Sequence, residues 1–339
     1  MASYDALLVL SFGGPRGPDE VMPFLEAVTH GRGVPRERLL AVAEHYFHMG
    51  GVSPINARTD DLIEALRRDF AADGRTLPIY LGNRFWDPKL DDTVRRMAQD
   101  GVRRAIAFKT SAYSSWSGCR AYRTDLERAL GALGDDAFEV DVIRPFYDHP
   151  DYVATCVERL EEALGELARL GRERQDAHVV YTAHSIPRAQ AAQCDYEAQL
   201  ATLVELVSER AGVANRQLVY QSRSGPPQVP WLEPDILDAL DALADRAPGA
   251  SVIVAPFGFV ADHMEVVWDL DHEAKERAEA LGLTMVRAKS ANDHPRLVRM
   301  VGQLIDERLD GSRPRLSLAP NGPRPDECAP DCCPPARRA

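Results

Sequence analysis

Short apolar runs alternate with amphipathic stretches along most of the chain. Eight runs rich in apolar and β-branched residues stand at 4–12, 77–81, 104–110, 138–143, 178–183, 217–221, 251–257 and 283–288. The stretches between them, such as 151–170, carry apolar residues at helical spacing with acidic residues on the opposite face. Alternating strands and helices are typical of parallel α/β units. The pattern predicts an α/β fold of two similar doubly wound, Rossmann-like halves, each with a four-stranded parallel sheet, and a cleft between them for the active site.

A change of composition near the C-terminus adds a third segment. We divide the chain into a first half at 1–150, a second half at 151–316 and a tail at 317–339, and expect the 151–170 helix to bridge the halves. The tail holds six of the 24 prolines, three of the six cysteines and almost no apolar residues. Such a segment cannot offset its ordering entropy by burying a core. Its cysteines are therefore the only anchor that the sequence offers.

Charge and composition narrow the class of protein. With 339 residues, 45% of them hydrophobic, the chain can bury a sizeable core. Lys and Arg number 40 against 52 Asp and Glu, a net charge of −12, which disfavours a surface that binds nucleic acid. The first residues, MASYDALLVLSFGG, lack the basic start of a signal peptide, and no apolar stretch approaches the roughly 18 residues of a transmembrane helix. We expect a cytoplasmic protein with no nucleic-acid partner and no transmembrane segment.

One histidine stands where ligands collect in such folds, at the carboxyl end of a strand. His184 follows the run at 178–183 and precedes Pro187 by three residues. The proline disfavours a helix just before it, so His184 is expected at the strand end and facing the cleft. A lone histidine at such a place is more often structural than functional, so a functional role requires a partner.

Acidic residues that follow another strand supply that partner. Glu265, Asp269 and Glu273 are spaced at i, i+4 and i+8, along one ridge of a helix. Like charges at this spacing repel by about 0.2–0.5 kcal/mol per pair. The ridge is either a solvated acidic face or a ladder that attracts a divalent cation and relays protons, and the nearby Asp262 and His263 favour the ladder. His184 with Glu265 would suit Fe(II), Zn(II) or Co(II), and two protein ligands suit a metal in transit.

Six ordered motifs carry a resemblance to a known family. They are LLVLSFGGP at 7–15, GGVSPIN at 50–56, SAYSSWSGC at 111–119, YTAHSIP at 181–187, QSRSGPPQVPWLEP at 221–234 and APFGFVADHMEVVWDLD at 255–271. Together they resemble the ferrochelatases, and more closely the bacterial coproporphyrin III ferrochelatases with a C-terminal cysteine motif, from about residue 4 to the C-terminus.

The resemblance implies an enzyme of heme biosynthesis, a lyase that inserts ferrous iron, its substrate, into coproporphyrin III. It implies His184 and Glu265 as the facing metal-site residues. Removing two pyrrole protons requires a base of near-neutral pKa, a role that suits His184. Asp269 and Glu273 would deliver iron or carry protons away. A downstream heme-pathway enzyme is a candidate partner.

The resemblance also implies a porphyrin-binding set, namely Phe12, Ser53, Tyr122, Arg32 and Arg84. Some relatives carry a tyrosine that ligates the product iron where Phe12 stands, and Phe12 has no such oxygen. His30 and His45 replace arginines that relatives often have, so Arg32 and Arg84 would compensate as partners of the propionates. The alternative for each is an ordinary surface charge.

The cysteines divide into a tail group and a scattered group. Cys328, Cys332 and Cys333 lie within six residues, with a spacing of neither the ferredoxin nor the zinc-ribbon type. The resemblance implies that they hold a [2Fe–2S] cluster with Cys156 as fourth ligand. Zinc is the alternative metal, and Cys156 as a small buried hydrophobe is the alternative for that residue. Cys119 and Cys194 are expected to bind no metal.

Three other functions stay open from the sequence. Two are enzymes of related chemistry, a protoporphyrin IX ferrochelatase and a chelatase that loads cobalt or nickel into a reduced tetrapyrrole. The third is a non-catalytic iron–sulfur or heme-binding sensor, which would keep the cysteines and have no need of the His184 and Glu265 pair.

Overall fold

The computed structural model describes residues 3–225, 227–329 and 331–335. All eight predicted strands are present within these residues. They are β1 (Ala6–Ser11), β2 (Ile79–Asn83), β3 (Arg104–Lys109), β4 (Glu139–Val142), β5 (Ala177–His184), β6 (Arg216–Gln221), β7 (Ser251–Ala255) and β8 (Thr284–Arg287).

Helices occupy the segments between the strands, as the alternation predicts. The longer helices are α1 (Pro18–Thr29), α2 (Arg36–His48), α3 (Pro54–Ala72), α4 (Leu90–Gln99), α5 (Ala121–Gly131), α6 (Pro150–Arg169), α8 (Tyr196–Ala211), α9 (Ile236–Arg246) and α12 (Pro295–Leu309). The shorter ones are η1 (Trp116–Arg120), η2 (Gly134–Asp136), η3 (Arg174–Asp176), α7 (Arg188–Ala191), α10 (Met264–Val266), η4 (Val267–Ala274) and α11 (Lys275–Ala280). None of the helices in the described part of the chain is long and apolar enough to cross a membrane.

The strands form two four-stranded sheets, with the orders β2-β1-β3-β4 and β6-β5-β7-β8. All pairs in both sheets are parallel. The first strand of each half therefore occupies the same inner place in its sheet, which confirms the predicted pair of similar doubly wound halves. Every residue of β1 is buried, because helices cover both faces of a parallel sheet, and this explains why its apolar run is continuous.

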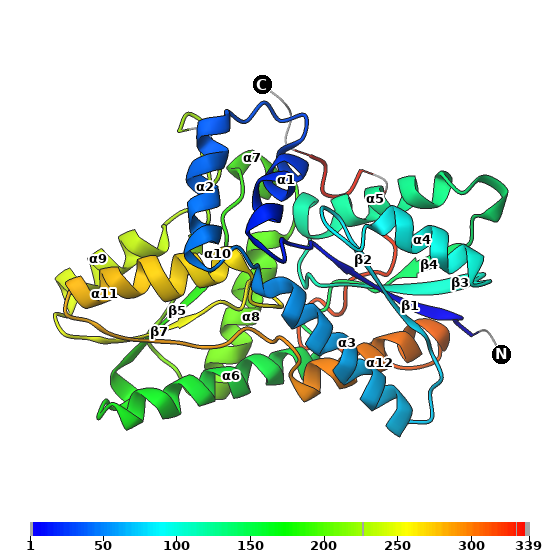
Figure 1. Ribbon diagram of the computed structural model, residues 1–339. Helices are drawn as coiled ribbons and strands as arrows, with labels where there is room; N and C mark the ends of the chain where they lie inside the picture. The colour runs from blue at the N-terminus through cyan, green and yellow to red at the C-terminus, as the bar shows by residue number, and fades with distance from the viewer. Residues whose placement is uncertain (1–2, 226, 330, 336–339) are drawn as a thin grey trace.

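Two helices cross between the halves (Figure 1). After β4 the chain enters α6, which packs against β7 and β8 of the second sheet. After β8 it enters α12, which returns to the first half and packs beside α3. Buried ion pairs hold α12 there, as Arg144, with 1% of its side chain exposed, lies 2.8 Å from Glu307. The last helix of the second half thus completes the first, and residue 150 separates two sheets but not two independent folding units.

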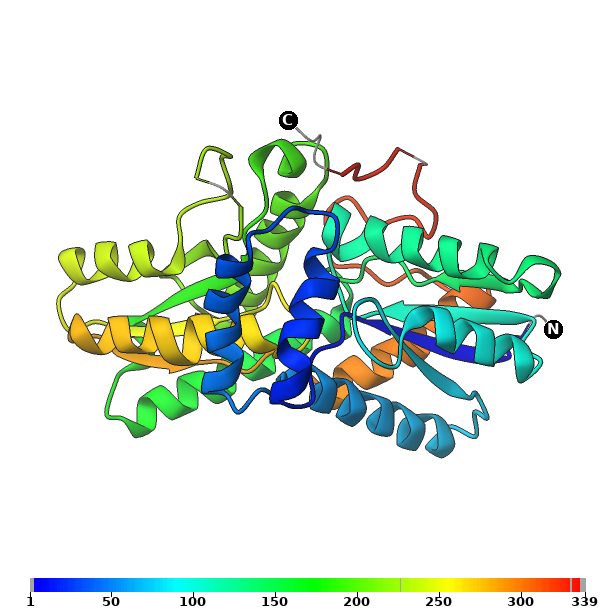
Figure 2. The same ribbon diagram turned by 45° about the horizontal axis from the view of Figure 1, so that its top comes forward.

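Helices α1 and α2 cover the gap between the two sheets (Figures 1 and 2). Their buried side chains form one apolar cluster with Met264 of α10, made by Val21, Phe24, Leu25, Leu39, Ala43 and Tyr46. Each fully buried side chain of this size contributes about 1.5–3 kcal/mol. This apolar cluster therefore holds α1 and α2 of the first half against α10 of the second half.

Polar contacts anchor the tail to the body. Leu318 donates its backbone N–H to the carbonyl of Asp148 at 2.8 Å, and Arg123 of α5 donates to the carbonyl of Asp326 at 2.9 Å. Arg324 pairs with Asp195 beside α8 at 2.8 Å. The prediction that the cysteines are the only anchor is wrong, because carboxylates and arginines from distant parts of the chain hold the segment.

Candidate active site

His184 lies at the carboxyl end of β5, as predicted. Its Nδ1 lies 2.5 Å from the carbonyl oxygen of Ser185, and the hydroxyl of Tyr196 donates to the carbonyl of His184 at 3.1 Å. These contacts fix the ring and direct Nε2 toward Glu265, whose Oε2 lies 3.5 Å away. The structure thus brings together the histidine and the carboxylate that the sequence singled out.

The turn after β7 positions Glu265. A Cβ atom at Gly258 would lie 2.4 Å from the Cβ of Ala183, so only glycine lets the turn pack this closely on β5 next to His184. Asp262 secures the other end of the turn, because it accepts hydrogen bonds from Ser290 at 2.8 Å and Arg287 at 3.0 Å. Asp262 is therefore a buried structural anchor, and it does not extend the acidic ladder.

Asp269 and Glu273 of the acidic ridge lie on a π-helix where the sequence predicts an ordinary one, and Glu265 lies on α10 just before it. Element η4 is wound with i→i+5 hydrogen bonds, a form that is rare and frequent at functional sites. Asp269 accepts hydrogen bonds from Ser222 Oγ at 2.5 Å and from Gln221 Nε2 at 3.0 Å. Glu273 accepts one from Trp268 Nε1 at 2.9 Å. The middle carboxylate is thus held by specific donors, unlike a merely solvated face.

Gln221 and Ser222 were not singled out from the sequence. They come at the carboxyl end of β6, beside His184 on β5, and this position was the signal that would have found them. Ser222 adopts a left-handed backbone with φ of 61°, which costs a non-glycine residue of order 1–3 kcal/mol. The strained residue is one of the two that hold Asp269.

The site separates the pKa values of its three central groups. Burial opposes a charge on His184, but the charge and hydrogen bond of Glu265 outweigh it and raise the pKa of His184 to about 9. Burial likewise opposes the charge on Glu265, but His184 lowers the pKa of that carboxyl to about 2. About a third of His184 and half of Glu265 are exposed, so water screens the pair, and only the directions of these two shifts matter here.

The pKa of Asp269 lies between those of Glu265 and His184. Burial raises its pKa to about 7, and the charge of Glu265 adds to this effect while the hydrogen bond from Ser222 opposes it. The sequence predicts His184 as the near-neutral base; in the structure the charge and hydrogen bond of Glu265 raise the pKa of the imidazole above that range, and the role of His184 stays a prediction. The near-neutral group is Asp269.

The structure divides the predicted porphyrin contacts. Phe12 is partly buried and packs on Phe85 with ring centroids 4.6 Å apart. Ser53 is buried at the start of α3 beside Gly14, whereas Arg32 is exposed in the turn after α1. These three positions are compatible with a ligand that enters between the halves.

Tyr122 and Arg84 do not fit the prediction that they offer free donors to propionates. Tyr122 is buried in the core beside the first sheet. Arg84 Nε donates to Asp125 at 2.6 Å, and its guanidinium lies over the Tyr122 ring at 4.8 Å. In this structure the Arg84 guanidinium is thus engaged by Asp125 and the Tyr122 ring, and the propionate contacts of both residues stay a prediction.

The tail cysteines lie near thiols other than Cys156. The sulfur atoms of Cys332 and Cys333 are 3.3 Å apart, and Cys333 lies close enough to Cys194 to lower the pKa of the Cys194 thiol. Burial raises the pKa of the Cys328 thiol, and the neighbouring Cys332 and Cys119 add to this effect.

Cys156 is buried in the hydrophobic core, where burial raises the pKa of its thiol. This packing favours the alternative of Cys156 as a small buried hydrophobe, and its place in the ligand set stays a prediction. Within the residues that the structure describes, no three His, Cys, Asp or Glu side chains are grouped to hold a metal ion.

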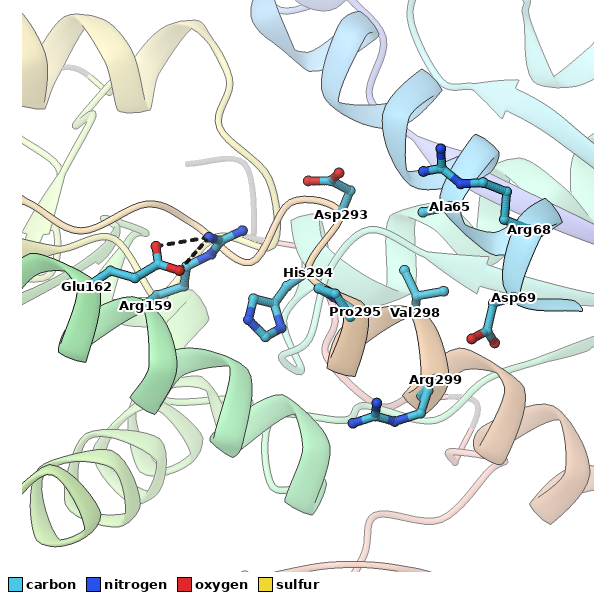
Figure 3. Close-up of a pocket in the computed structure, with 10 residues that line it drawn as sticks. All are labelled: Ala65, Arg68, Asp69, Arg159, Glu162, Asp293, His294, Pro295, Val298 and Arg299. Carbon is cyan, nitrogen blue, oxygen red and sulfur yellow. Dashed lines mark hydrogen bonds and ion pairs between the residues drawn. The ribbon is translucent and has the colours of Figure 1, made fainter. Parts of the chain in front are cut away.

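A cavity of about 650 Å³ lies elsewhere, between α3, α6 and the start of α12. Figure 3 shows its charged lining, in which Arg159 pairs with Glu162 at 3.0 Å. Arginines and carboxylates line it in equal number, and neither His184 nor Glu265 is among its residues. This cavity therefore gives no support to the predicted site.

The fold and the facing pair define a chelatase-type protein of two parallel-sheet halves. The structure of SirB from Bacillus subtilis with Fe³⁺ superposes with a TM-score of 0.58 at 10% identity, covering 94% of this chain and 100% of that one. The sirohydrochlorin chelatase SirB from Bacillus subtilis subspecies spizizenii, in complex with cobalt, gives a TM-score of 0.54 at 9% identity, with the same coverage. At such identities the likeness concerns the fold alone.

Sequence comparison identifies the family. The ferrochelatase family profile matches residues 4–309. Coproporphyrin III ferrochelatase of Mycolicibacterium smegmatis is 50% identical over 322 residues, 94% of each chain. Coproporphyrin III ferrochelatase of Nocardia farcinica is 49% identical over 346 residues, covering 98% of this chain and 97% of that one. A ferrochelatase of Rhodopirellula baltica is 47% identical over 330 residues, covering 97% and 93%. The chain belongs to the ferrochelatase family.

Proposed function

We propose that this protein inserts ferrous iron into coproporphyrin III, and that His184 and Glu265 receive the iron. The observation that carries the proposal is the 3.5 Å approach of His184 Nε2 to Glu265 Oε2 at the carboxyl ends of the second sheet. It occurs in a chain that is 50% identical to a coproporphyrin III ferrochelatase. A nitrogen and an oxygen ligand suit Fe(II) and leave positions open for the porphyrin nitrogens.

The pKa values of the site give each residue a role in the proton balance. Insertion of Fe²⁺ releases two pyrrole protons, and His184, whose pKa is raised to about 9, must lose its own proton before Nε2 binds iron. Asp269, with a pKa of about 7, accepts such a proton at neutral pH and returns it to solvent along the ridge toward Glu273. The ionised Glu265 meanwhile attracts the cation.

Apolar and polar walls fit the two parts of the porphyrin. Phe12 and the rings of Phe24 and Phe85, inclined against it, offer an apolar surface. Since Arg84 is paired with Asp125, we assign the propionates to Ser53 and Arg32. The net charge of −12 repels a tetra-anion, so these local donors must reverse the field near the propionates.

Anaerobic iron insertion into coproporphyrin III and protoporphyrin IX, measured side by side, tests the proposal. We expect faster insertion into coproporphyrin III, and a loss of about 100-fold or more in H184A and E265Q. Equal rates would contradict the substrate assignment. Metallation that survives unchanged in H184A would favour a heme-binding sensor, and preference for Co²⁺ or Ni²⁺ with a reduced tetrapyrrole would favour the other chelatase.

We further propose a [2Fe–2S] cluster held by Cys328, Cys332, Cys333 and a fourth thiol. Cys194 is the best fourth candidate, because the neighbouring Cys333 lowers the pKa of its thiol to about 7 and the thiolate is the form that binds metal. Formation of the cluster would require these thiols to draw closer than they lie here. Bound there, the cluster would tie the tail to α8, much as structural metals add folding energy. Zinc at the same thiols is the alternative.

A buried cation beside these thiols supports an anionic group at this place. Lys109 is 0% exposed, and its ammonium donates to the carbonyl of Ser111 at 3.1 Å and lies 5.8 Å from the Phe146 ring. Neither contact carries a negative charge, and a buried charge is costly unless it is paired. Cys328 and Cys333 are near enough to raise the pKa of Lys109 against the effect of burial, so thiolates of a cluster would supply the missing charge.

Single Cys→Ala variants test the ligand set. We expect C332A and C194A to lose the visible absorption and the acid-labile sulfide, and C156A, its matched control in the core, to keep both. Loss of the chromophore in C156A alone would refute the assignment of Cys194. A stoichiometric zinc content without sulfide would favour zinc.

We also propose that the protein works in the cytoplasm. All six cysteines are free thiols in the structure, as is usual in a reducing compartment. Iron coproporphyrin, its product, would then pass to a downstream heme-pathway enzyme. Co-sedimentation of the protein with the soluble fraction of its host tests the location.

A further inference from the structure

A buried tyrosine of the first half reaches the segment of the second half that carries the candidate site. Tyr113 lies in the loop between β3 and η1 and is 2% exposed. Its hydroxyl donates to the backbone carbonyl of Phe257 at 2.5 Å. Burial raises the pKa of Tyr113 well above its ordinary value, so the hydroxyl keeps its proton and remains a donor. The contact joins the first half to the turn that follows β7.

The carbonyl of Phe257 stands at the start of the turn that leads to Glu265. The next residue, Gly258, packs on β5 and donates its N–H to the carbonyl of Thr182 at 2.9 Å. Asp262 anchors the far end of the turn within the second half. The start of the turn, by contrast, is held by a donor from the first half. A displacement of Phe257 would therefore move Glu265 relative to β5.

The ring of Tyr113 contacts the residue that holds His184. The rings of Tyr113 and Tyr196 meet edge to face, with centroids 6.0 Å apart and planes at 88°. Tyr196 in turn donates its hydroxyl to the carbonyl of His184 at 3.1 Å. The Tyr113 ring also stacks on Tyr147 of the first half, with centroids 6.1 Å apart. One side chain of the first half thus supports the histidine and the carboxylate of the pair.

A second contact of the same loop joins the halves without reaching the pair. Ser114 donates its backbone N–H to Oε1 of Gln199 at 2.7 Å, and its hydroxyl accepts from Nε2 of that residue at 2.9 Å. Both residues are buried, so the loop is fixed on α8 independently of Phe257. Tyr152 of α6 reaches the carbonyl of Phe257 only at 3.5 Å. Loss of the Tyr113 hydroxyl would therefore leave the halves together and free mainly this carbonyl.

We infer that Tyr113 is a positioning residue that sets, from the first half, the approach of His184 to Glu265. The pair then reaches its 3.5 Å separation only where the two halves are docked. A shift of about 1 Å in such a group can lower a rate by about 100-fold. The effect on the rate rests on the proposed function, whereas the effect on the geometry does not.

Crystal structures of the unaltered protein and of Y113F test the geometric role. Y113F keeps the ring contacts and removes only the hydroxyl. We expect the distance between His184 Nε2 and Glu265 Oε2 to lengthen by about 0.5–1 Å, because the carbonyl of Phe257 loses its short bond. Y181F is the matched control, since it removes a buried hydroxyl that contacts Ser208 at 2.8 Å within the second half. An unchanged distance in Y113F, or an equal change in Y181F, would overturn the inference.

Kinetics of iron insertion then separate positioning from packing. Y113F should lower kcat by about tenfold or more and change KM for coproporphyrin III by less than about twofold. Y152F should have a smaller effect, and Y181F should keep both constants, although its Tm should fall about as far as that of Y113F.

A kcat that follows the loss of Tm equally in Y113F and Y181F would give Tyr113 a packing role only and overturn the inference. Absence of metallation in the unaltered protein would refute the proposed function. The crystal structures would still decide whether Tyr113 positions the pair.

Discussion

Replacing Asp269 by Asn should make the protein more stable and less active. Burial and the charge of Glu265 raise the pKa of Asp269 from 3.8 to about 7, against the hydrogen bond from Ser222. Between these two values the folded protein keeps a proton that the unfolded chain has released. Its stability contribution therefore falls as the pH rises through this range. Asn removes the charge while its amide oxygen still accepts from Ser222 and Gln221.

The magnitude follows from the shift. Raising the pKa from 3.8 to about 7 is roughly three units, or about 4 kcal/mol at about 1.36 kcal/mol per unit. Asp269 is partly exposed, and water screens part of this cost. We therefore expect D269N to exceed the unaltered protein by about 2 kcal/mol above neutral pH, and by less in mild acid.

Urea unfolding and initial rates of iron insertion, each at about pH 5.5 and about pH 8, check the reasoning. D269N should show its larger stability gain at the higher pH, a kcat lower by about 100-fold, and no fall of rate around neutral pH. D245N, at an exposed position of α9, is the matched control and should change neither property. A stability difference that is equal at both pH values, or a full kcat in D269N, would refute the role of Asp269.

Three further variants test the fold and the proposed cluster site of the tail cysteines. G258A should cost about 2–3 kcal/mol by thermal unfolding, because its Cβ would lie 2.4 Å from β5, whereas G131A, with open space around it, should cost nothing. E307Q should lower the free energy of unfolding in urea by about 3 kcal/mol, since it removes the charge that pairs with the buried Arg144. A loss below about 1 kcal/mol would argue that this ion pair does not hold α12 against the first half. K109M should lower the reduction potential of the proposed cluster, measured by redox titration, because a buried positive charge near it is lost. An unchanged potential would show that the charge of Lys109 does not act on the cluster.

Much of the fold was predictable because both sheets are parallel and covered on two faces. A strand such as β1 is then a continuous apolar run, and its position can be read without its neighbours. The crossing of α12 to the first half was not predictable. An amphipathic helix carries the same apolar stripe whichever sheet it covers, and the partner of Arg144 lies 163 residues away at Glu307.

The candidate site was likewise predictable only in part. His184 stands at the end of β5 and Glu265 in the helix that follows β7, so position and residue type indicated both. The protonation pattern depended on contacts that no spacing reveals, above all Ser222 and Gln221 reaching Asp269 from another strand. The role of Cys156 meets a related limit, since a helix cysteine looks the same in sequence whether it faces a cluster or the core.

The arrangement of charges explains how one small region can handle both a dication and protons. His184 and Glu265 form an ion pair that carries no net charge, so the site does not repel iron before it arrives. When iron replaces the proton on His184, the region gains one positive charge, and the ionisation of Asp269 at neutral pH offsets it. Because the pKa of His184 is raised by its partner while that of Asp269 lies near neutrality, we propose that iron can enter while a proton leaves. A single histidine of neutral pKa, as the sequence suggested, would bind iron or accept a proton, but not both at once.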